Sequence, residues 1–286
     1  MTMGYGSYSA EDWSKLRTSR KLETTNSVTE TFVKQSCDPK YDPRYIGTRE
    51  CFDSEDHPNS TPIVVGLDVT GSMGYLAVKV ASEALNELIM KLYSTDAVED
   101  PALMCAAYGD YMDDAPLQVT QFESDIRIVE QLLDLHFENG GQGYVVPHYL
   151  WDFLTNRTNI DAINKRQQKG FVFTIGDGAD IRRVAPHPEE ALRAVEKKFH
   201  VFHIMIVGQG MYDGPSKHNE RLLNGRTMNI RQTDIDLIPQ MIISAIQLQK
   251  GAALDTVLAQ WDEMERPRLG NILGQLQLCG GEQVFL

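Results

Sequence analysis

Four oxygen-bearing side chains follow two short apolar runs of the sequence. Asp68, Thr70 and Ser72 occupy alternate positions directly after the first run. Asp177 follows the second run and is flanked by glycines. Carboxylate and hydroxyl oxygens are hard ligands, and Mg²⁺ takes octahedral oxygen coordination while retaining several waters. These residue types therefore predict a Mg²⁺ or Mn²⁺ site, provided that the fold brings the two groups together.

The segments around these side chains alternate between strand and helix patterns. We expect strands over 63–67, 103–108, 117–122, 171–175 and 201–207, and helices over 76–93, 124–137, 188–199 and 234–249, with a further helix beginning at Pro147. Such alternation predicts an α/β domain with a doubly wound, mostly parallel sheet and helices on both faces. Ligands bind beyond the carboxyl ends of such strands, where we expect Asp68 and Asp177 to lie.

The chain divides into three parts. Residues 1–61 form a polar N-terminal arm, with a short helix expected over 9–16, whose scattered aromatic residues need a core to pack against. Residues 62–250 form the α/β domain, and residues 251–286 a C-terminal helix and tail. In the tail, Pro267 is expected to end a helix, and 272–278 alternates like a strand. That strand either packs back on its own domain or adds to a partner's sheet, which would give a homo-oligomer.

Composition excludes several classes of protein. The net charge of −13 argues against nucleic-acid binding, which needs a basic face. We expect no membrane span, because no run of about 18 apolar residues occurs, and no signal peptide, because the first nine residues lack its pattern. Four scattered cysteines indicate reduced thiols, and hence a cytoplasmic protein.

The pattern Asp68-x-Thr70-x-Ser72, followed by a Gly-Gly loop and by Asp177, resembles the metal-ion-dependent adhesion site of the von Willebrand factor A (vWA) family. The resemblance covers roughly residues 62–249 and implies a vWA, Rossmann-like fold. It also implies that Thr70 and Ser72 bind the metal directly, while the two aspartates hold water ligands. The family has a threonine where Gln142 stands. Either the Gln142 carbonyl or a water takes that position.

The resemblance implies a protein partner. In one mode, a carboxylate of the partner completes the metal coordination; in the other, the chain is an intracellular adaptor for an AAA+ ATPase, which the lack of a signal peptide favours. The arm and the stretch 115–119 also faintly resemble phage and bacterial members of the family. Six residues beside the predicted site are candidates for partner contact: Met73, Tyr75, Asp110, Asp113, Asp114 and Tyr144. Met73 can instead pack internally, and the acidic turn formed by the three aspartates can be merely solvated.

The alternative is an enzyme. Asp68 after an apolar strand, with Gly-Asp-Gly-Ala-Asp over 176–180, also resembles phosphatases of the haloacid dehalogenase type, in which such an aspartate is the nucleophile. Thr70 fits poorly, because that chemistry needs an acid/base residue there. Lys169 is the candidate for the required lysine, but it precedes its strand. A helix cap would explain Asp68 alone, but not the other site residues.

Overall fold

The structure is a computed structural model of the 286-residue chain. It describes residues 27, 31–94, 97–125, 127–208 and 216–277. The helix expected over 9–16 lies outside these ranges.

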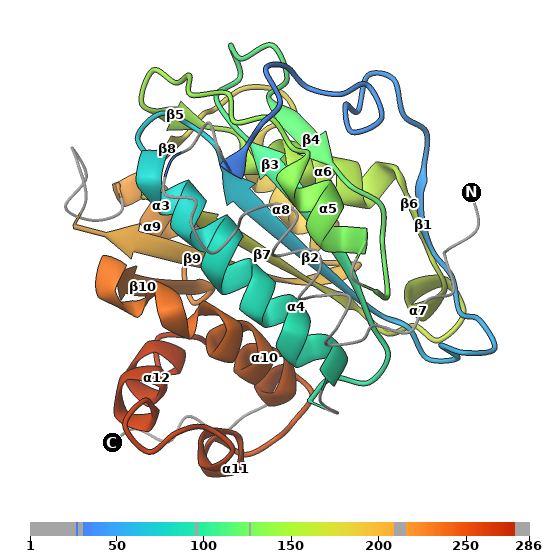
Figure 1. Cartoon of the computed structure of the whole chain (residues 1–286), viewed down its shortest axis with the longest axis vertical. Coiled ribbons are helices and arrows are strands. Elements are labelled where there is room, and N and C mark those ends of the chain that lie inside the picture. The colour runs from blue at the N-terminus through green and yellow to red at the C-terminus, as the bar shows by residue number, and fades with distance from the viewer. Residues whose placement is uncertain (1–26, 28–30, 95–96, 126, 209–215, 278–286) are drawn as a thin grey trace.

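A six-stranded sheet forms the centre of the fold (Figure 1). Its strands are β2 (Thr61–Asp68), β3 (Pro101–Tyr108), β4 (Leu117–Val119), β7 (Gly170–Gly176), β9 (Phe199–Val207) and β10 (Thr227–Arg231). Their spatial order is β10-β9-β7-β2-β3-β4, and only the edge strand β4 is antiparallel. Every residue of β2 is buried, as its continuous apolar run predicts for a central parallel strand. The predicted α/β class with a mostly parallel sheet is confirmed.

Helices cover both faces of the sheet because successive residues of each strand point to opposite sides. Ile63, Val65 and Leu67 pack in one hydrophobic cluster, and Val64 packs in a second. The first cluster holds α3 (Gly74–Lys79), the π-helix η1 (Val80–Ala84), α4 (Leu85–Ser94), α5 (Arg127–Leu133) and α10 (Ile238–Gln249). The second holds α6 (Pro147–Asn156) and α8 (Pro188–Val195), behind the sheet in Figure 1. None of the helices in the described ranges is long and apolar enough to cross a membrane.

Several short elements have no clear signal in the sequence. Two small parallel pairs join β1 (Arg49–Cys51) to β6 (Thr158–Ile160), and β5 (Tyr144–Val145) to β8 (Asp180–Ile181). Two further short helices are α7 (Asp161–Asn164) and α9 (Lys217–Leu222). The helix predicted over 234–249 is divided into the 3₁₀ helix η2 (Gln232–Leu237) and α10. Strand β10 was also not predicted, because its five residues include only two apolar side chains, Met228 and Ile230.

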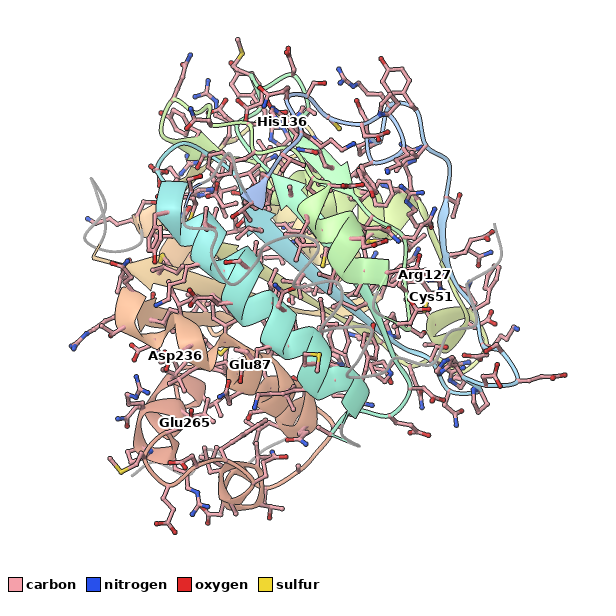
Figure 2. All side chains as sticks on the ribbon, viewed as in Figure 1. Cys51, Glu87, Arg127, His136, Asp236 and Glu265 are labelled. Atoms are coloured by element: carbon pink, nitrogen blue, oxygen red, sulfur yellow. The ribbon has the colours of Figure 1, made fainter. Side chains whose placement is uncertain are left out.

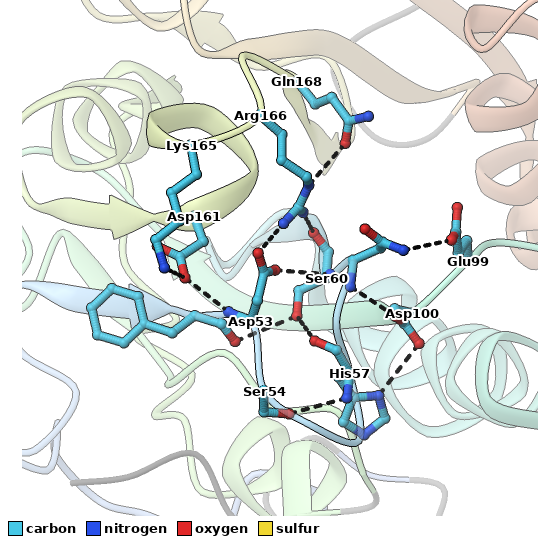
Figure 3. A network of polar contacts seen from close by, with 12 residues as sticks. Asp53, Ser54, His57, Ser60, Glu99, Asp100, Asp161, Lys165, Arg166 and Gln168 are labelled. Atoms are coloured by element: carbon cyan, nitrogen blue, oxygen red, sulfur yellow. Dashed lines mark hydrogen bonds and ion pairs between the residues drawn. The ribbon is translucent and has the colours of Figure 1, made fainter.

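The described part of the N-terminal arm packs on the α/β core. Phe32 stacks on Phe137 with ring centroids 5.8 Å apart. A polar network fixes the later arm residues, as Figure 3 shows. In it, the Arg166 guanidinium pairs with Asp53 and donates to the Ser60 carbonyl at 2.8 Å. These contacts tie the arm to the loop that precedes β7.

The predicted strand over 272–278 is wrong for its described residues. Pro267 lies in the first turn of α12 (Arg266–Leu273), where its missing N–H costs no helical hydrogen bond. Ile272 and Leu273 are therefore helical, and both are buried against the core. A shorter helix, α11 (Leu254–Ala259), precedes it. Gln240 of α10 donates to the carboxylate of Glu265, the residue before α12, at 3.3 Å. Figure 2 labels Glu265.

Candidate metal centre

The two groups of predicted ligands meet at one edge of the sheet. Asp68 is the last residue of β2, and Asp177 directly follows β7, the neighbouring parallel strand, in which Ile175 pairs with Leu67. The chain continues from β2 to β3 on one side, whereas β7 lies on the other side (Figure 1). Such a reversal of strand order opens a crevice beyond the carboxyl ends, the usual ligand site of an open α/β sheet.

The loop after β2 gathers three oxygen-bearing side chains. The Thr70 backbone N–H and hydroxyl donate to Asp68 Oδ1 at 2.9 and 2.6 Å. The hydroxyl oxygens of Thr70 and Ser72 lie 3.2 Å apart. Asp68 and Thr70 are buried, whereas Ser72 is exposed. The cluster therefore opens to solvent on the Ser72 side.

Two further residues, Gly176 and Tyr108, shape the surroundings of Asp68, and sequence reasoning missed Tyr108. A Cβ on Gly176 would lie 3.1 Å from both Asp68 Oδ2 and the Tyr108 hydroxyl, so the absence of a side chain there makes room for the carboxylate. The Tyr108 hydroxyl donates to the Ile175 carbonyl at 2.9 Å and holds the end of β7. The only signal in the sequence is the glycine before Asp177.

Burial and like charge dominate the electrostatics of this site. Burial, and then the neighbouring Asp177 carboxylate, raise the pKa of Asp68 to about 7, against the hydrogen bonds from Thr70. Asp177 is itself 2% exposed and accepts the Ala179 N–H at 3.3 Å. Two buried carboxylates beside two hydroxyls form an all-oxygen donor set, which suits a hard divalent cation. Among the described residues, no three His, Cys, Asp or Glu side chains group as a metal site by themselves.

The Gly-Gly loop approaches the same cluster. Gly71 N–H donates to the Gly140 carbonyl at 2.8 Å, and a Cβ on Gly141 would lie 3.4 Å from Thr70. Gly141 has a φ of +121°, a conformation that favours glycine. Gln142 is exposed, and its backbone N–H donates to Asp110 Oδ2 at 3.1 Å. The loop thus lies beside Thr70, and Gln142 follows at the solvent boundary.

The residues predicted to contact a partner fall into two groups. Tyr75 is 52% exposed, Tyr144 is 37% exposed, and Asp114 is also exposed. For Met73 the prediction is wrong, because its side chain is fully buried in the core cluster with Leu76.

Two of the three aspartates in the acidic turn, Asp110 and Asp113, accept hydrogen bonds from backbone N–H groups of loop residues. Asp110 is only 1% exposed, so it is not a surface contact as predicted. It accepts the N–H groups of Met112 and Gln142 at 3.0 and 3.1 Å, and so ties its own turn to the Gly-Gly loop. Asp113 is half-buried and accepts the Asp110 N–H at 2.7 Å. The acidic residues of this turn thus differ in role, and Asp114 alone is exposed.

No family model and no curated protein matches the sequence. Solved structures similar to it include proximal thread matrix protein 1 of the mussel byssus, described with a zinc-occupied metal-ion-dependent adhesion site (15% identity, TM-score 0.48, covering 69% of this chain and 49% of that chain). A second is the pilus adhesin SpaC of Lactobacillus rhamnosus GG (7% identity, TM-score 0.47, covering 70% of this chain and 31% of that chain). A third is a von Willebrand factor type A structure from Catenulispora acidiphila (16% identity, TM-score 0.46, covering 66% of this chain and 43% of that chain).

This chain spans about half the length of those proteins or less. At these identities, the interpretation of the site depends on the strand order and loop residues of this chain.

Proposed function

We propose that the chain is a divalent-cation-dependent protein-interaction module of the vWA type, which binds Mg²⁺ or Mn²⁺. The observation that carries the proposal is the meeting of Asp68 and Asp177 from adjacent strand ends, with Thr70 and Ser72 beside them. The hydroxyls of Thr70 and Ser72 would bind the cation directly, and the carboxylates would hold its waters. When bound, the cation would supply a coordination position for a partner's oxygen, and the site opens to solvent at Ser72.

The partner in this proposal is a protein that contributes a carboxylate. The exposed tyrosines beside the crevice, Tyr75 and Tyr144, support a protein partner, because aromatic side chains are enriched at the centres of protein interfaces. An intracellular adaptor role with an AAA+ ATPase is the more specific form of the proposal, and it depends on the family resemblance alone.

Millimolar Mg²⁺ or Mn²⁺ should stabilise the protein, because a ligand that binds only the folded state shifts the unfolding equilibrium by mass action. At about 100 times the dissociation constant, the melting temperature should rise by about 5 °C. The double variant Thr70→Ala, Ser72→Ala should stay folded and lose this rise in a thermal-shift assay.

The matched control removes two hydroxyls elsewhere. Ser82 and Thr155 each donate to the carbonyl four residues earlier in a helix, at 2.7 and 2.9 Å, and neither is a predicted ligand. The variant Ser82→Ala, Thr155→Ala should keep the full response to Mg²⁺. Absence of a response to either cation in the wild type would contradict the proposal.

Gln142→Thr should tighten Mg²⁺ binding severalfold, measured by titration calorimetry. The neighbouring Gly141 already lies against Thr70, so a compact hydroxyl at the next position can replace a water of the cation. Gln142→Ala is the control and should leave the affinity near that of the wild type. Equal affinities for the threonine and alanine variants would mean that position 142 does not reach the cation.

The phosphatase alternative receives no support from the position of Lys169. This lysine precedes β7 and donates to the Glu196 carbonyl at 2.7 Å, whereas Asp177 follows the other end of the strand. Eight residues of extended chain lie from one to the other, which is about 26 Å at about 3.3 Å per residue. We expect no hydrolysis of p-nitrophenyl phosphate above background in Mg²⁺. Turnover that disappears in Asp68→Asn would favour the phosphatase.

A further inference from the structure

Arg182 is held between two tyrosine rings at the rim of the crevice. Its guanidinium carbon lies 4.7 Å from the ring centroid of Tyr111 and 4.2 Å from that of Tyr144. One guanidinium nitrogen also lies 3.5 Å from the Tyr111 hydroxyl, and the Arg182 backbone N–H donates to the Val145 carbonyl at 2.8 Å. Contacts of a cation with two aromatic faces stabilise one orientation of this otherwise flexible side chain.

The three residues come from the three loops that surround the candidate metal centre. Tyr111 lies in the turn after β3, and Tyr144 begins β5, three residues after the Gly141 that touches Thr70. Arg182 follows β8, five residues after Asp177, and β8 pairs with β5. The stack therefore belongs to the same rim as the predicted cation ligands.

The stacked guanidinium still has donors to offer. One nitrogen lies at the Tyr111 hydroxyl, and a planar guanidinium with five N–H groups can still offer two of them side by side to a carboxylate. Within the described ranges no carboxylate forms an ion pair with Arg182, whereas Arg127 and Arg166 both pair with aspartates. Arg182 is only half-buried, so the residue is partly accessible to solvent. It is thus a pre-oriented binding group for an anion.

Exposed apolar side chains accompany this group. Tyr75 is 52% exposed, Met112 is 62% exposed and Tyr144 is 37% exposed, and all three lie in the loops or the helix start that surround the crevice. Tyrosine, methionine and arginine are the residue types enriched in protein interfaces, and tyrosine and arginine dominate their binding energy. The rim therefore combines an oriented cation with apolar contact area.

We propose that Arg182 is the second anchor of the interface, and that the partner is a protein segment with two acidic residues flanking an apolar one. One carboxylate completes the cation coordination, and the other accepts two N–H bonds from Arg182, with the apolar side chain between them against the exposed tyrosines. This inference rests on the proposed cation-dependent function. It adds the requirement for a second carboxylate, which a cation site alone does not impose.

The test is a selection of random twelve-residue peptides displayed on phage, carried out on the full chain in Mg²⁺ with elution by chelator. Wild-type protein should enrich peptides with two acidic residues around an apolar one. Selection on Arg182→Ala should enrich peptides with a single acidic residue. For a peptide selected on the wild type, Arg182→Ala should weaken binding about tenfold or more, the effect expected from losing charge-assisted hydrogen bonds.

Three controls separate the outcomes. Arg193→Ala removes the same charge from an exposed position of α8 and should leave binding unchanged. Replacing the second acidic residue of the peptide by its amide should weaken binding to the wild type, but not to Arg182→Ala. The rise in melting temperature with Mg²⁺ should persist in Arg182→Ala, which shows that the cation site is intact.

Peptides eluted by chelator that carry one acidic residue and bind wild type and Arg182→Ala equally would overturn the role of Arg182 and leave the proposed function standing. Failure to obtain any peptide that depends on Mg²⁺ would overturn both.

Discussion

Replacing Asp177 by asparagine should stabilise the metal-free protein and abolish its response to Mg²⁺. Asp68 and Asp177 are buried at adjacent strand ends, and the second carboxylate opposes ionisation of the first. Removing one of two like charges from a buried site relieves repulsion and desolvation. We expect a gain of about 1–2 kcal/mol in the free energy of unfolding, equivalent to about one unit in the pKa of a neighbouring group.

The substitution keeps the local hydrogen bond, because the asparagine side-chain carbonyl can still accept the Ala179 N–H that Asp177 accepts at 3.3 Å. It removes a carboxylate that would hold the cation's water, so the cation-dependent gain should vanish. The substitution should therefore raise the stability of the metal-free protein and remove cation binding. Such a trade-off is expected where a functional site holds like charges together at a cost in stability.

Urea denaturation at pH 8, with chelator and with Mg²⁺, measures both effects. Asp114→Asn is the control, since it removes the same charge from an exposed position of the neighbouring loop and should change neither quantity appreciably. An Asp177→Asn protein that is less stable than wild type in chelator would mean that Asp177 has a structural role and does not repel Asp68.

The sequence could place Asp68 and Asp177 at one edge of the sheet because each lies at the end of a strand with a strong signal. Apolar runs before Asp68 and Asp177 indicate central parallel strands, and the carboxyl ends of such strands meet at one edge of the sheet. The stack around Arg182 had no such signal. Tyr111, Tyr144 and Arg182 are far apart in sequence and meet through the two-residue strands β5 and β8, which are too short to show a pattern.

Burial of individual loop residues was harder to predict. Met73 follows Ser72 in the loop after β2, as an exposed contact residue would, but it lies where α3 begins and its side chain turns into the core. Asp110 is buried although it belongs to an acidic turn, because its carboxylate satisfies backbone N–H groups of two loops. In both cases a tertiary contact decides the environment, and no local pattern reports it.

The C-terminal tail shows the same limit at the level of secondary structure. Alternating apolar and polar residues after Pro267 indicate a strand, whereas a proline in the first turn is equally compatible with the start of a helix. Packing decides between them, because a helix places Leu269, Ile272 and Leu273 together on the face that contacts α10 and β10.

The double variant Ile272→Ala, Leu273→Ala should therefore lose about 4 kcal/mol or more of unfolding free energy. The two side chains are 6% and 3% exposed, so their truncation leaves cavities in the main core. Asn271→Ala, at an exposed position of the same helix, should cost little. Urea denaturation compares the three proteins.

The tail was also considered as a means of self-association through a sheet edge, and a substitution of Gln275 tests this role. Its side-chain amide accepts the Asn229 backbone N–H at 2.9 Å and donates to the Asn229 carbonyl at 3.2 Å, so it covers the outer edge of β10. Gln275→Ala uncovers these groups, and an unpaired strand edge invites pairing with another chain. We expect a small loss of stability and increased self-association of Gln275→Ala in sedimentation velocity. A wild-type protein that is oligomeric and becomes a stable monomer in Ile272→Ala, Leu273→Ala would instead show that the tail docks on a partner.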